Sequence, residues 1–537
     1  MKLDKLGLSF YKDWEEKGYS LPEYDREAVA EYTHEHPQWI HFGAGNIFRA
    51  FQANLAQTLL NRGAIHTGLI VAEGYDYEII ENMYRPHDGL SILVTLKANG
   101  TIEKTVIGSI VEALTLDSDH FKEFQRLQDI FKKETLQFAS FTITEKGYNL
   151  KDNSGNFLPS VLQDMEHGPN LPKSYIGKIT ALLYARFLAG QSPLAMVSMD
   201  NCSHNGTKLY RAVRAFAQRW TDLNFTEKEF LSYIDTPQKV SFPWTMIDKI
   251  TPRPDLSIKK LLTKDGIEDL EPFITGKNTY IAPFVNAEES EYLVIEDSFP
   301  NGRPSLEKSG VVFASRETVD KVEKMKVCTC LNPLHTALAI FGCLLGYELI
   351  STEMKDSTLR RLVEGIGYRE GLPVAVDPEI LNPQEFLDTV LTIRIPNPFM
   401  PDTPQRIMTD TSQKLAVRFG ETIKAYANSP DLSVSDLKLI PLVLAGWLRY
   451  LMAIDDNGLP FQLSPDPMLD TLCPYLSGVT LGSKFQAKKL LEPILKSQQI
   501  FGVDLFEIKM ADLVSTYFEE MTSSTGAVRR TLEKYVQ

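Results

Sequence analysis

The segment from Glu323 to His335 holds the residue types best suited to chemistry in this chain. Lys326 follows Glu323 by three positions and His335 follows Asn332 by the same interval, so each pair shares a face if the segment is helical. Pro333 reshapes the backbone between the two pairs. An amine, a carboxamide and an imidazole can therefore converge on one point. Such a set suits hydride transfer at a secondary alcohol, which needs a base for the hydroxyl proton and donors for the developing alkoxide.

Two alternatives to this chemical interpretation stay open. Lys326 and Glu323 could form a surface ion pair while His335 is a hydrogen-bonded core histidine. A metal site would need three nitrogen, sulfur or oxygen ligands, but Cys328 and Cys330 lack a second cysteine pair and no helix-spaced histidine pair is visible. A desolvated lysine with a lowered pKa can act as the base without a metal, so no metal is predicted.

Gly43 and Gly45 lie where a predicted strand, residues 39–42, meets a segment with helical spacing of apolar residues, 46–55. Glycines at such a turn let the backbone approach a pyrophosphate, and the helix start adds free N–H groups and partial positive charge. The third glycine of the usual fingerprint is missing, because position 48 is Phe. A turn that only packs strand on helix is the alternative.

Glu73 ends the next predicted strand, residues 68–73. A carboxylate there can accept hydrogen bonds from an adenosine ribose and repel a 2′-phosphate. Residues 74–78 contain no Arg or Lys to receive that phosphate. The pattern favours NAD over NADP as cofactor, with an acidic loop residue of no function as the alternative.

Composition and length restrict the class of protein. The 537 residues favour two domains, and 43% hydrophobic with 23% charged residues is typical of a globular protein. A net charge of −14 argues against a nucleic-acid partner but permits an anionic substrate. Five irregularly spaced cysteines indicate thiols in a reducing compartment. No signal peptide is visible and the apolar stretches 334–345 and 439–448 are shorter than a membrane span, so a cytoplasmic protein without membrane contact is expected.

Strand and helix patterns alternate over about the first 310 residues, and helical periodicity dominates from Glu317 onward. We therefore expect an α/β, Rossmann-like dinucleotide-binding domain over residues 1–312, with an N-terminal extension and insertions. A mainly α-helical substrate and catalytic domain is expected over residues 313–537.

Six motifs in order resemble one family, the polyol-specific long-chain dehydrogenases typified by the mannitol dehydrogenases. The similarity extends from about Ile40 to Val417, and six matches in order make coincidence implausible. The matching segments are Gly43–Phe51, Thr144–Tyr148, Asp200–Gly206, Phe242–Pro252, Ile295–Pro304 and Glu323–His335.

The resemblance implies roles for individual residues. Lys326 is similar to the family's catalytic acid/base, Glu323 to its proton-conducting neighbour, and Asn332 with His335 to the pair that holds the reacting oxygen. The implied cofactor residues are Gly43, Gly45, Asn46, Ile47, Phe48, Arg49 and Glu73. The implied substrate residues are Asn201 and Asp248, which face substrate or nicotinamide, and Arg406 with Lys414, which bind substrate hydroxyls. Turn, cap and solvated-helix functions remain the alternatives for these last four residues.

One departure from the family pattern concerns spacing. Five residues separate Lys326 from Asn332 where the mannitol-type pattern has four, and the family's Asn-Gly becomes Asn332-Pro333. Either a bulge absorbs the additional residue or the lysine approaches the substrate differently. Lys324 is the fallback base, although it lacks the three-residue relation to Glu323.

The variant Cys330–Thr336 resembles the sugar-acid branch of the family. A uronate carboxylate calls for an additional guanidinium or ammonium group, and Arg253 is a candidate beside Arg406 and Lys414. The expected function is NAD-dependent, metal-independent interconversion of D-fructuronate and D-mannonate. Mannitol–fructose or tagaturonate chemistry is the alternative, and a non-enzymatic nucleotide-binding protein is disfavoured because the acid/base and oxygen-binding residues are present. The oligomeric state is not indicated.

Overall fold

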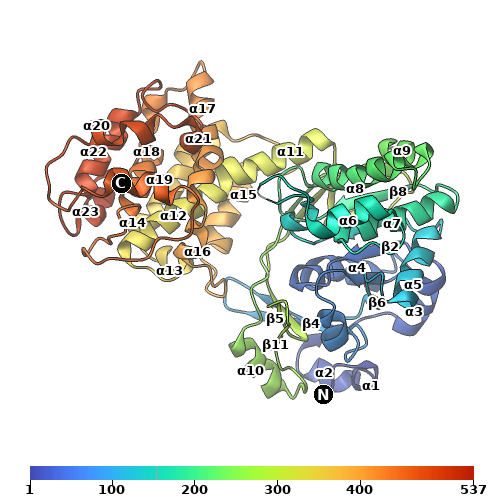
Figure 1. Cartoon of the computed structure of the whole chain (residues 1–537). Helices are drawn as coiled ribbons and strands as arrows, with labels where there is room; N and C mark the ends of the chain where they lie inside the picture. Colours follow the sequence, from blue (N-terminus) through green and yellow to red (C-terminus); the bar gives the residue numbers. More distant parts are fainter. Residues whose placement is uncertain (153) are drawn as a thin grey trace. The chain divides into compact units, whose positions relative to one another are not determined.

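The computed structural model describes residues 1–152 and 154–537. The chain divides into two compact units, Met1–Asp320 and Lys321–Gln537, which are coloured blue to yellow and yellow to red in Figure 1. The boundary predicted from sequence, between residues 312 and 313, falls inside strand β15 (Val312–Ala314). Helix α11 (Arg316–Lys324) contains the observed boundary.

The first unit is built on a six-stranded parallel sheet. Its strand order is β6-β3-β2-β7-β8-β9, which is the dinucleotide-binding order with its reversal between β2 and β7. The strands are β2 (Trp39–Phe42), β3 (Leu69–Glu73), β6 (Ile110–Thr115), β7 (Phe138–Phe141), β8 (Leu194–Ser198) and β9 (Val240–Ser241). Every residue is buried in four of these strands, β2, β3, β7 and β8. Such burial is expected for a parallel sheet that is covered on both faces.

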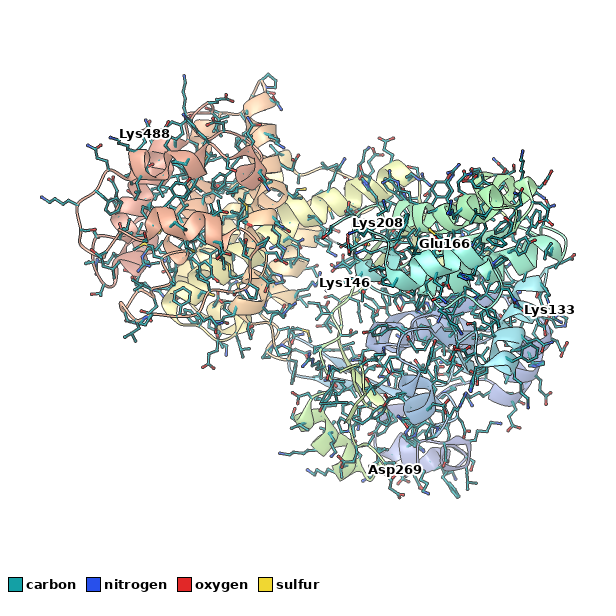
Figure 2. The ribbon with its side chains drawn as sticks, in the orientation of Figure 1. Lys133, Lys146, Glu166, Lys208, Asp269 and Lys488 are labelled. Carbon is teal, nitrogen blue, oxygen red and sulfur yellow. The ribbon has the colours of Figure 1, made fainter. Side chains whose placement is uncertain are left out.

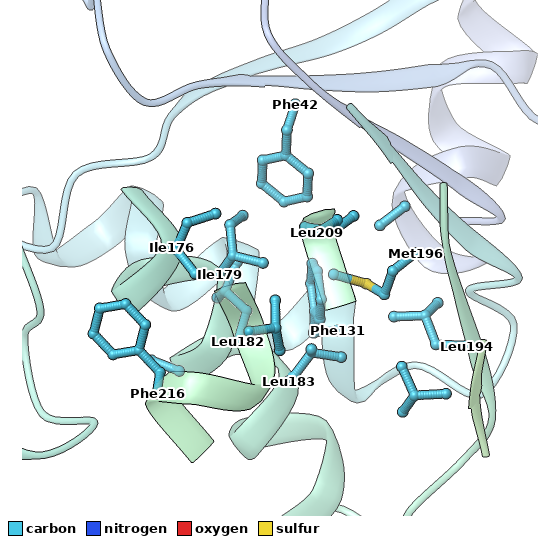
Figure 3. Close-up of a cluster of buried hydrophobic side chains, with 14 of the residues drawn as sticks. Phe42, Phe131, Ile176, Ile179, Leu182, Leu183, Leu194, Met196, Leu209 and Phe216 are labelled. Carbon is cyan, nitrogen blue, oxygen red and sulfur yellow. The ribbon is translucent and has the colours of Figure 1, made fainter. Parts of the chain in front are cut away.

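The two faces of this sheet follow from alternation along its strands. Ile40 and Phe42 pack into the hydrophobic cluster of Figure 3, together with Met196, whereas Trp39 and Val197 enter the cluster on the opposite face. Helices α5 (Phe121–Lys132), α7 (Tyr175–Leu188) and α8 (Asn205–Asp222) contribute to the first cluster, and η1 (Phe48–Gln52) with α4 (Ala53–Asn61) contributes to the second.

The longest helices of the first unit are α5, α7 and α8, and its other helices and helical turns are short. In chain order, the full set is α1 (Lys5–Leu8), α2 (Tyr11–Glu16), α3 (Arg26–Glu35), η1 (Phe48–Gln52), α4 (Ala53–Asn61), η2 (Ile80–Tyr84), α5 (Phe121–Lys132), η3 (Glu145–Tyr148), α6 (Pro159–His167), α7 (Tyr175–Leu188), α8 (Asn205–Asp222), α9 (Lys228–Asp235), α10 (Leu256–Asp265) and η4 (Leu306–Ser309).

Smaller sheets account for the predicted insertions. A four-stranded sheet has the order β1-β5-β4-β13, a three-stranded sheet has the order β10-β14-β15, and β11 pairs with β12. Their strands are β1 (Tyr19–Ser20), β4 (Ser91–Leu96), β5 (Ile102–Ile107), β10 (Thr245–Asp248), β11 (Phe273–Ile274), β12 (Tyr280–Ile281), β13 (Phe284–Glu288) and β14 (Tyr292–Glu296).

The second unit is helical around α12 and α18, and α18 is buried along its whole length. Its elements are η5 (Met325–Cys330), α12 (Asn332–Leu345), α13 (Ile350–Glu353), α14 (Ser357–Glu364), η6 (Gly365–Gly371), η7 (Leu372–Val374), α15 (Pro383–Thr389), η8 (Val390–Arg394), α16 (Pro404–Met408), η9 (Thr411–Gln413), η10 (Ala416–Gly420), α17 (Glu421–Asn428), η11 (Val434–Asp436), α18 (Leu439–Tyr450), α19 (Leu469–Leu476), α20 (Ala487–Leu495), α21 (Gln498–Phe501), α22 (Ala511–Met521) and α23 (Ala527–Tyr535). The predicted combination of an α/β domain with a mainly helical domain is confirmed.

One helical run within the described residues, Arg316–Leu345, has the length and hydropathy of a membrane span. Its most apolar window is 78% buried inside the protein. Buried core helices share this length and composition, so the run is a weak indication of a membrane span.

Charged side chains such as Lys133 and Lys488 point away from the ribbon of their own unit (Figure 2).

Glu353 is a buried carboxyl group of the second unit, fully shielded from solvent at the end of α13. Neither oxygen has a hydrogen-bond partner in the part of the chain that the structure describes. A Cβ at Gly342 would lie 2.2 Å from its Oε1, so the glycine makes room for it. Burial, with a smaller effect of Asp356, raises the pKa of Glu353 well above its usual range.

Glu353 makes stability fall as pH rises. Because its folded pKa is raised, the folded chain binds more protons than the unfolded chain at every pH between the two values. The free energy of unfolding therefore decreases as pH increases from about 4.3, the unfolded value. Glu353→Gln should flatten the decline in Tm between about pH 5 and pH 8 and stabilise the protein at the upper end by about 1–3 kcal/mol. The exposed Glu533, changed to Gln, is the control, and an unaltered pH slope in Glu353→Gln would contradict the assignment.

Candidate active site

The glycine turn lies at the carboxyl end of β2, beside the strand-order reversal of the parallel sheet. Gly43 has φ +110°, and a Cβ there would lie 2.2 Å from the carbonyl oxygen of Thr142, which follows β7. The Gly43 N–H donates to the carbonyl of Ala72 at 2.9 Å. Backbone from three neighbouring strand ends therefore meets at a position that only glycine can occupy.

Three backbone N–H groups after this glycine are available to a ligand. Among the described residues, no acceptor is found for the amides of Gly45, Asn46 and Ile47. A Cβ added at Gly45 would meet no atom within 4 Å. These amides stand at the start of the helical run η1–α4, where the partial charge is positive. The turn therefore fits a dinucleotide diphosphate.

The next two residues stabilise the turn through buried side chains. The Phe48 ring stacks on His41 with centroids 4.2 Å apart. Arg49 donates from Nη1 to the carbonyl of Ala282 at 2.7 Å and from Nη2 to Asn46 Oδ1 at 2.8 Å. Burial lowers the pKa of Arg49 to about 10. The side chains of Phe48 and Arg49 thus contact other parts of the protein and support the turn from behind.

The Glu73 carboxylate connects two backbone turns of the first unit, the glycine turn after β2 and the turn after β3. Its carboxylate accepts the N–H of Ala44 at 2.8 Å and those of Tyr75 and Asp76 at 2.8 and 3.1 Å. Burial raises the pKa of Glu73, and the three amide hydrogen bonds oppose that effect. A ribose bound here would share oxygens that backbone amides already contact.

Asp200 is a second buried brace, and the sequence analysis assigned it no role. It accepts the N–H groups of Ile143 and Thr144 at 3.0 and 2.8 Å and the hydroxyl of Tyr148 at 2.5 Å. Thr144 has φ +64°, a conformation that is strained for a residue with a side chain. Asp200 therefore holds the strained turn after β7. The sequence signal that could have identified this role is its place at the start of the matching segment Asp200–Gly206.

The first unit also carries three of the predicted substrate residues. Asp248 ends β10 and is buried, whereas Asn201 is exposed after β8. Asn205 stabilises this region because its Nδ2 donates to Thr245 Oγ1 at 2.8 Å and its Oδ1 accepts the Thr245 N–H at 3.0 Å. Arg253 is exposed on the loop after β10, and no hydrogen bond or ion pair joins its side chain to another described residue.

In the second unit, a π turn follows the end of α11. The Leu331 N–H donates to the carbonyl of Lys326, five residues back, at 3.1 Å, and η5 has this winding throughout. A π turn holds more residues per turn than an α-helix, so it is the kind of irregularity that the bulge alternative calls for. Lys326 is 3% exposed, whereas the fallback Lys324 is exposed. Glu323 and Asn332 are half-buried.

His335 lies on the first turn of α12, half-buried, near charged groups from three other segments. Desolvation lowers its pKa to about 4; Asp402 opposes this effect, and Arg394, Arg418 and Arg406 add to it. The imidazole is therefore neutral at neutral pH.

Two predicted substrate residues join this group. Arg406 pairs with Asp402, and Lys414 Nζ donates to the carbonyl of Thr409. Burial and the charge of Arg418 lower the pKa of Lys414. The structure thus brings His335, Arg406 and Lys414 into one electrostatic group of the second unit. No three His, Cys, Asp or Glu side chains cluster as a metal site in the described ranges.

The parallel sheet with its glycine turn defines a dinucleotide-dependent dehydrogenase fold. Residues 37–308 match the mannitol dehydrogenase Rossmann domain and residues 318–522 match the mannitol dehydrogenase C-terminal domain, so the chain belongs to the mannitol dehydrogenase family. It is 52% identical to a D-mannonate oxidoreductase of Thermotoga maritima over 100% of this chain and 99% of that protein. It is 27% identical to a D-mannonate oxidoreductase of Escherichia coli K12, over 87% and 89% of the two chains.

Solved structures show the same architecture. Pseudomonas fluorescens mannitol 2-dehydrogenase, in a ternary complex with NAD and D-mannitol, has a TM-score of 0.71 and 27% identity over 99% of both chains. A substrate-free D-sorbitol dehydrogenase has a TM-score of 0.79 at 24% identity over 96% of this chain and 97% of that one, which shows the fold alone.

Replacement of Gly45 tests the nucleotide turn. Because a Cβ at Gly45 has no atom of the described residues within 4 Å, Gly45→Ala should fold normally but weaken NADH binding at least about 10-fold by occupying the space of the diphosphate. Fluorescence titration with NADH and a thermal melt measure the two effects. Gly478→Ala, also unobstructed, is the control. Unchanged NADH affinity in Gly45→Ala would remove this turn from the cofactor site.

The protonation state of His335 is also measurable. Its resonance in the NMR spectrum of the ¹⁵N-histidine-labelled protein, assigned with His335→Gln, should titrate near pH 4. The pKa is low because desolvation and the arginines disfavour the imidazolium. Titration at the usual value of about 6.5 would show that the imidazole is solvated.

Proposed function

We propose that this chain is an NAD-dependent oxidoreductase that interconverts D-fructuronate and D-mannonate. The observation that carries the proposal is 52% identity over the full chain with a D-mannonate oxidoreductase. Substrate and reaction type therefore follow from one full-length relative, and NAD follows from the Rossmann domain match and the mannitol 2-dehydrogenase complex. The charge of the second unit agrees with an acidic substrate.

The surroundings of His335 suit an acidic substrate. Arg394, Arg418 and Arg406 lower the pKa of His335, whereas Asp402 raises it. Lys414 adds a further cation beside Arg418, and Asp410 and Asp466 oppose the effect of these cations on Lys414. A local excess of positive charge attracts a carboxylate in spite of the net charge of −14.

The proposed proton transfer belongs to Lys326. In mannonate oxidation, its neutral amine removes the proton of the reacting hydroxyl, and in the reverse direction its ammonium returns that proton. The buried position of Lys326 keeps competing water away from the amine. Glu323, three residues earlier, is proposed to pass the proton to solvent. The bound nicotinamide accepts or supplies the hydride.

Asn332 and His335 are proposed to hold the reacting oxygen. A neutral imidazole and a carboxamide each donate one N–H, and both hydrogen bonds strengthen as negative charge develops on that oxygen. Arg406 and Lys414 are proposed to bind substrate hydroxyls, and Asn201, Asp248 and Arg253 to supply polar contacts from the first unit.

The nucleotide turn is proposed to bind NAD chiefly through backbone. Gly43 and Gly45 permit close approach, while Asn46 and Ile47 offer N–H groups. Phe48, Arg49 and Glu73 act behind the turn, with Glu73 also proposed at the ribose.

Domain limits and location are part of the proposal. The dinucleotide-binding domain is placed at 1–312 and the helical domain at 313–537. All five cysteines are thiols, and we place the protein in the cytoplasm.

A polyol dehydrogenase is the second candidate, because mannitol 2-dehydrogenase shares the whole architecture at 27% identity. Its substrate has no carboxylate, so the positive charge around His335 would have no counterpart there. Reduction of fructose therefore separates the two candidates.

Consumption of NADH with fructuronate, tagaturonate and fructose tests the proposal. Fructuronate should give a kcat/KM at least about 10-fold above that of fructose, because only the acid can pair with the cations near His335. Lys326→Ala should lower kcat by about 10²–10⁴ through loss of the acid/base. The neighbouring exposed lysine provides the control, Lys324→Ala, and activity should persist in EDTA.

The outcome that would contradict this function is equal or faster reduction of fructose. A Lys326→Ala enzyme as active as the control would instead overturn the assignment of the acid/base. Inactivation by EDTA that added metal reverses would overturn the metal-independent mechanism.

A further inference from the structure

We propose that Arg418 is the residue that binds the substrate carboxylate and thereby sets the preference for a uronate over an uncharged ketose. This inference rests on the proposed function and assigns its charge selectivity to one side chain that the sequence analysis did not single out.

Arg418 is a partly desolvated guanidinium, and most of its N–H groups donate no hydrogen bond within the described residues. A guanidinium has five N–H donors, and in the described part of the chain Arg418 uses one of its nitrogens, Nη1, which donates to Thr336 Oγ1. No carboxylate lies within ion-pair distance of it among those residues, and no acid contributes to its pKa. Burial alone lowers the pKa of Arg418 to about 10. A desolvated cation without a counter-ion is unfavourable unless an anion arrives.

The donors that remain are open to a ligand. Arg418 is half-buried, and none of its nitrogens is among the sealed polar atoms without partners, in contrast to Arg49 Nε. The neighbouring cations are already engaged, because Arg406 pairs with Asp402 and Lys414 donates to the carbonyl of Thr409. Unlike Arg406, Arg418 has no carboxylate partner among the described residues, and its planar fork matches a carboxylate.

Thr336 fixes Arg418 relative to the residues proposed to hold the reacting oxygen. The Thr336 hydroxyl accepts from Arg418 and donates to the carbonyl of Asn332 at 2.8 Å. Asn332, His335 and Thr336 share the first turn of α12. The Thr336 hydroxyl thus connects Arg418 by hydrogen bonds to the turn that carries Asn332 and His335, the proposed oxygen-binding pair.

The spacing within the substrate agrees with this arrangement. Three carbons separate the ketone carbon of D-fructuronate from its carboxyl carbon, so the carboxylate lies about 5 Å from the reacting carbon when the chain is extended. Thr336 hydrogen-bonds both to Arg418 and to the turn of α12 that carries His335, and Arg418 also lowers the pKa of that imidazole. One acid substrate can therefore place its ketone oxygen at His335 and its carboxylate at Arg418.

The test compares D-fructuronate with its methyl ester, which has the same carbon skeleton without the charge. The wild type should prefer the acid in kcat/KM by about 10- to 100-fold, the range of a charge-assisted bidentate contact. Arg418→Gln should abolish that preference through a higher KM for the acid, leaving kcat within about 3-fold and the ester unaffected. Arg418→Lys should restore part of the preference, because an ammonium keeps the charge but not the fork.

A matched control is Arg360→Gln, since Arg360 is an exposed arginine of the second unit paired with Glu364. It should leave the acid-to-ester ratio unchanged. A second readout is the rise in Tm on adding D-mannonate in the presence of NAD. Arg418→Gln should lose this rise, but should retain the rise given by NAD alone.

The outcomes separate this inference from the proposed function. Selective loss of the acid preference in Arg418→Gln supports the inference. Equal loss on acid and ester, or an unchanged ratio, in an enzyme that reduces fructuronate overturns the inference alone. A wild type that reduces fructose and no ketouronate overturns both.

Discussion

Backbone atoms crowd together where β2 and β7 end, and the nucleotide half of the site depends on how their polar groups are paired. Gly43 lies against the carbonyl of Thr142 with no room for a side chain. The surrounding amides are taken up by two buried carboxylates, Glu73 on one side and Asp200 on the other. Desolvation opposes the charge of both acids, and their amide hydrogen bonds compensate. This pairing leaves the Gly45–Ile47 amides for an external anion.

The second unit manages charge in the opposite manner. Cations gather around the start of α12, and only some of them are neutralised internally by pairs such as Arg406 with Asp402. Desolvation, with a smaller effect of the same cations, keeps His335 neutral, so that in its proposed role it would donate a hydrogen bond without adding charge to the site. An imidazole can thus orient a reacting oxygen while neighbouring guanidiniums interact with a distant acid group. Separation of these two tasks is what a substrate with both a ketone and a carboxylate requires.

Much of this organisation could be predicted from the sequence. Continuous apolar runs identified the central strands, and the motifs from Gly43 to His335 identified the family, the α/β-plus-helical fold and the oxidoreductase class, all of which the family matches confirm. Local patterns could not reveal how side chains are used after folding. The spacing that placed Glu73 at a strand end gave no sign that Ala44, Tyr75 and Asp76 amides surround it. Arg418 was indistinguishable from a solvated helix charge until its burial, and the absence of a paired acid among the residues that the structure describes, set it apart. The assigned roles of the individual site residues remain predictions.

The π turn at η5 has a consequence for the direction of the Lys326 side chain. In an α-helix each residue advances the azimuth by about 100°, so one additional residue rotates everything before it relative to everything after it. In this chain the wider winding is confined to Met325–Cys330, and α12 begins two residues later and is buried over most of its length. The direction in which Lys326 leaves the helix therefore depends on the winding of residues 325–330 as well as on the position of α12 in the core. Helical pitch, as well as amino-acid identity, is then a variable that sets where the amine of residue 326 can reach.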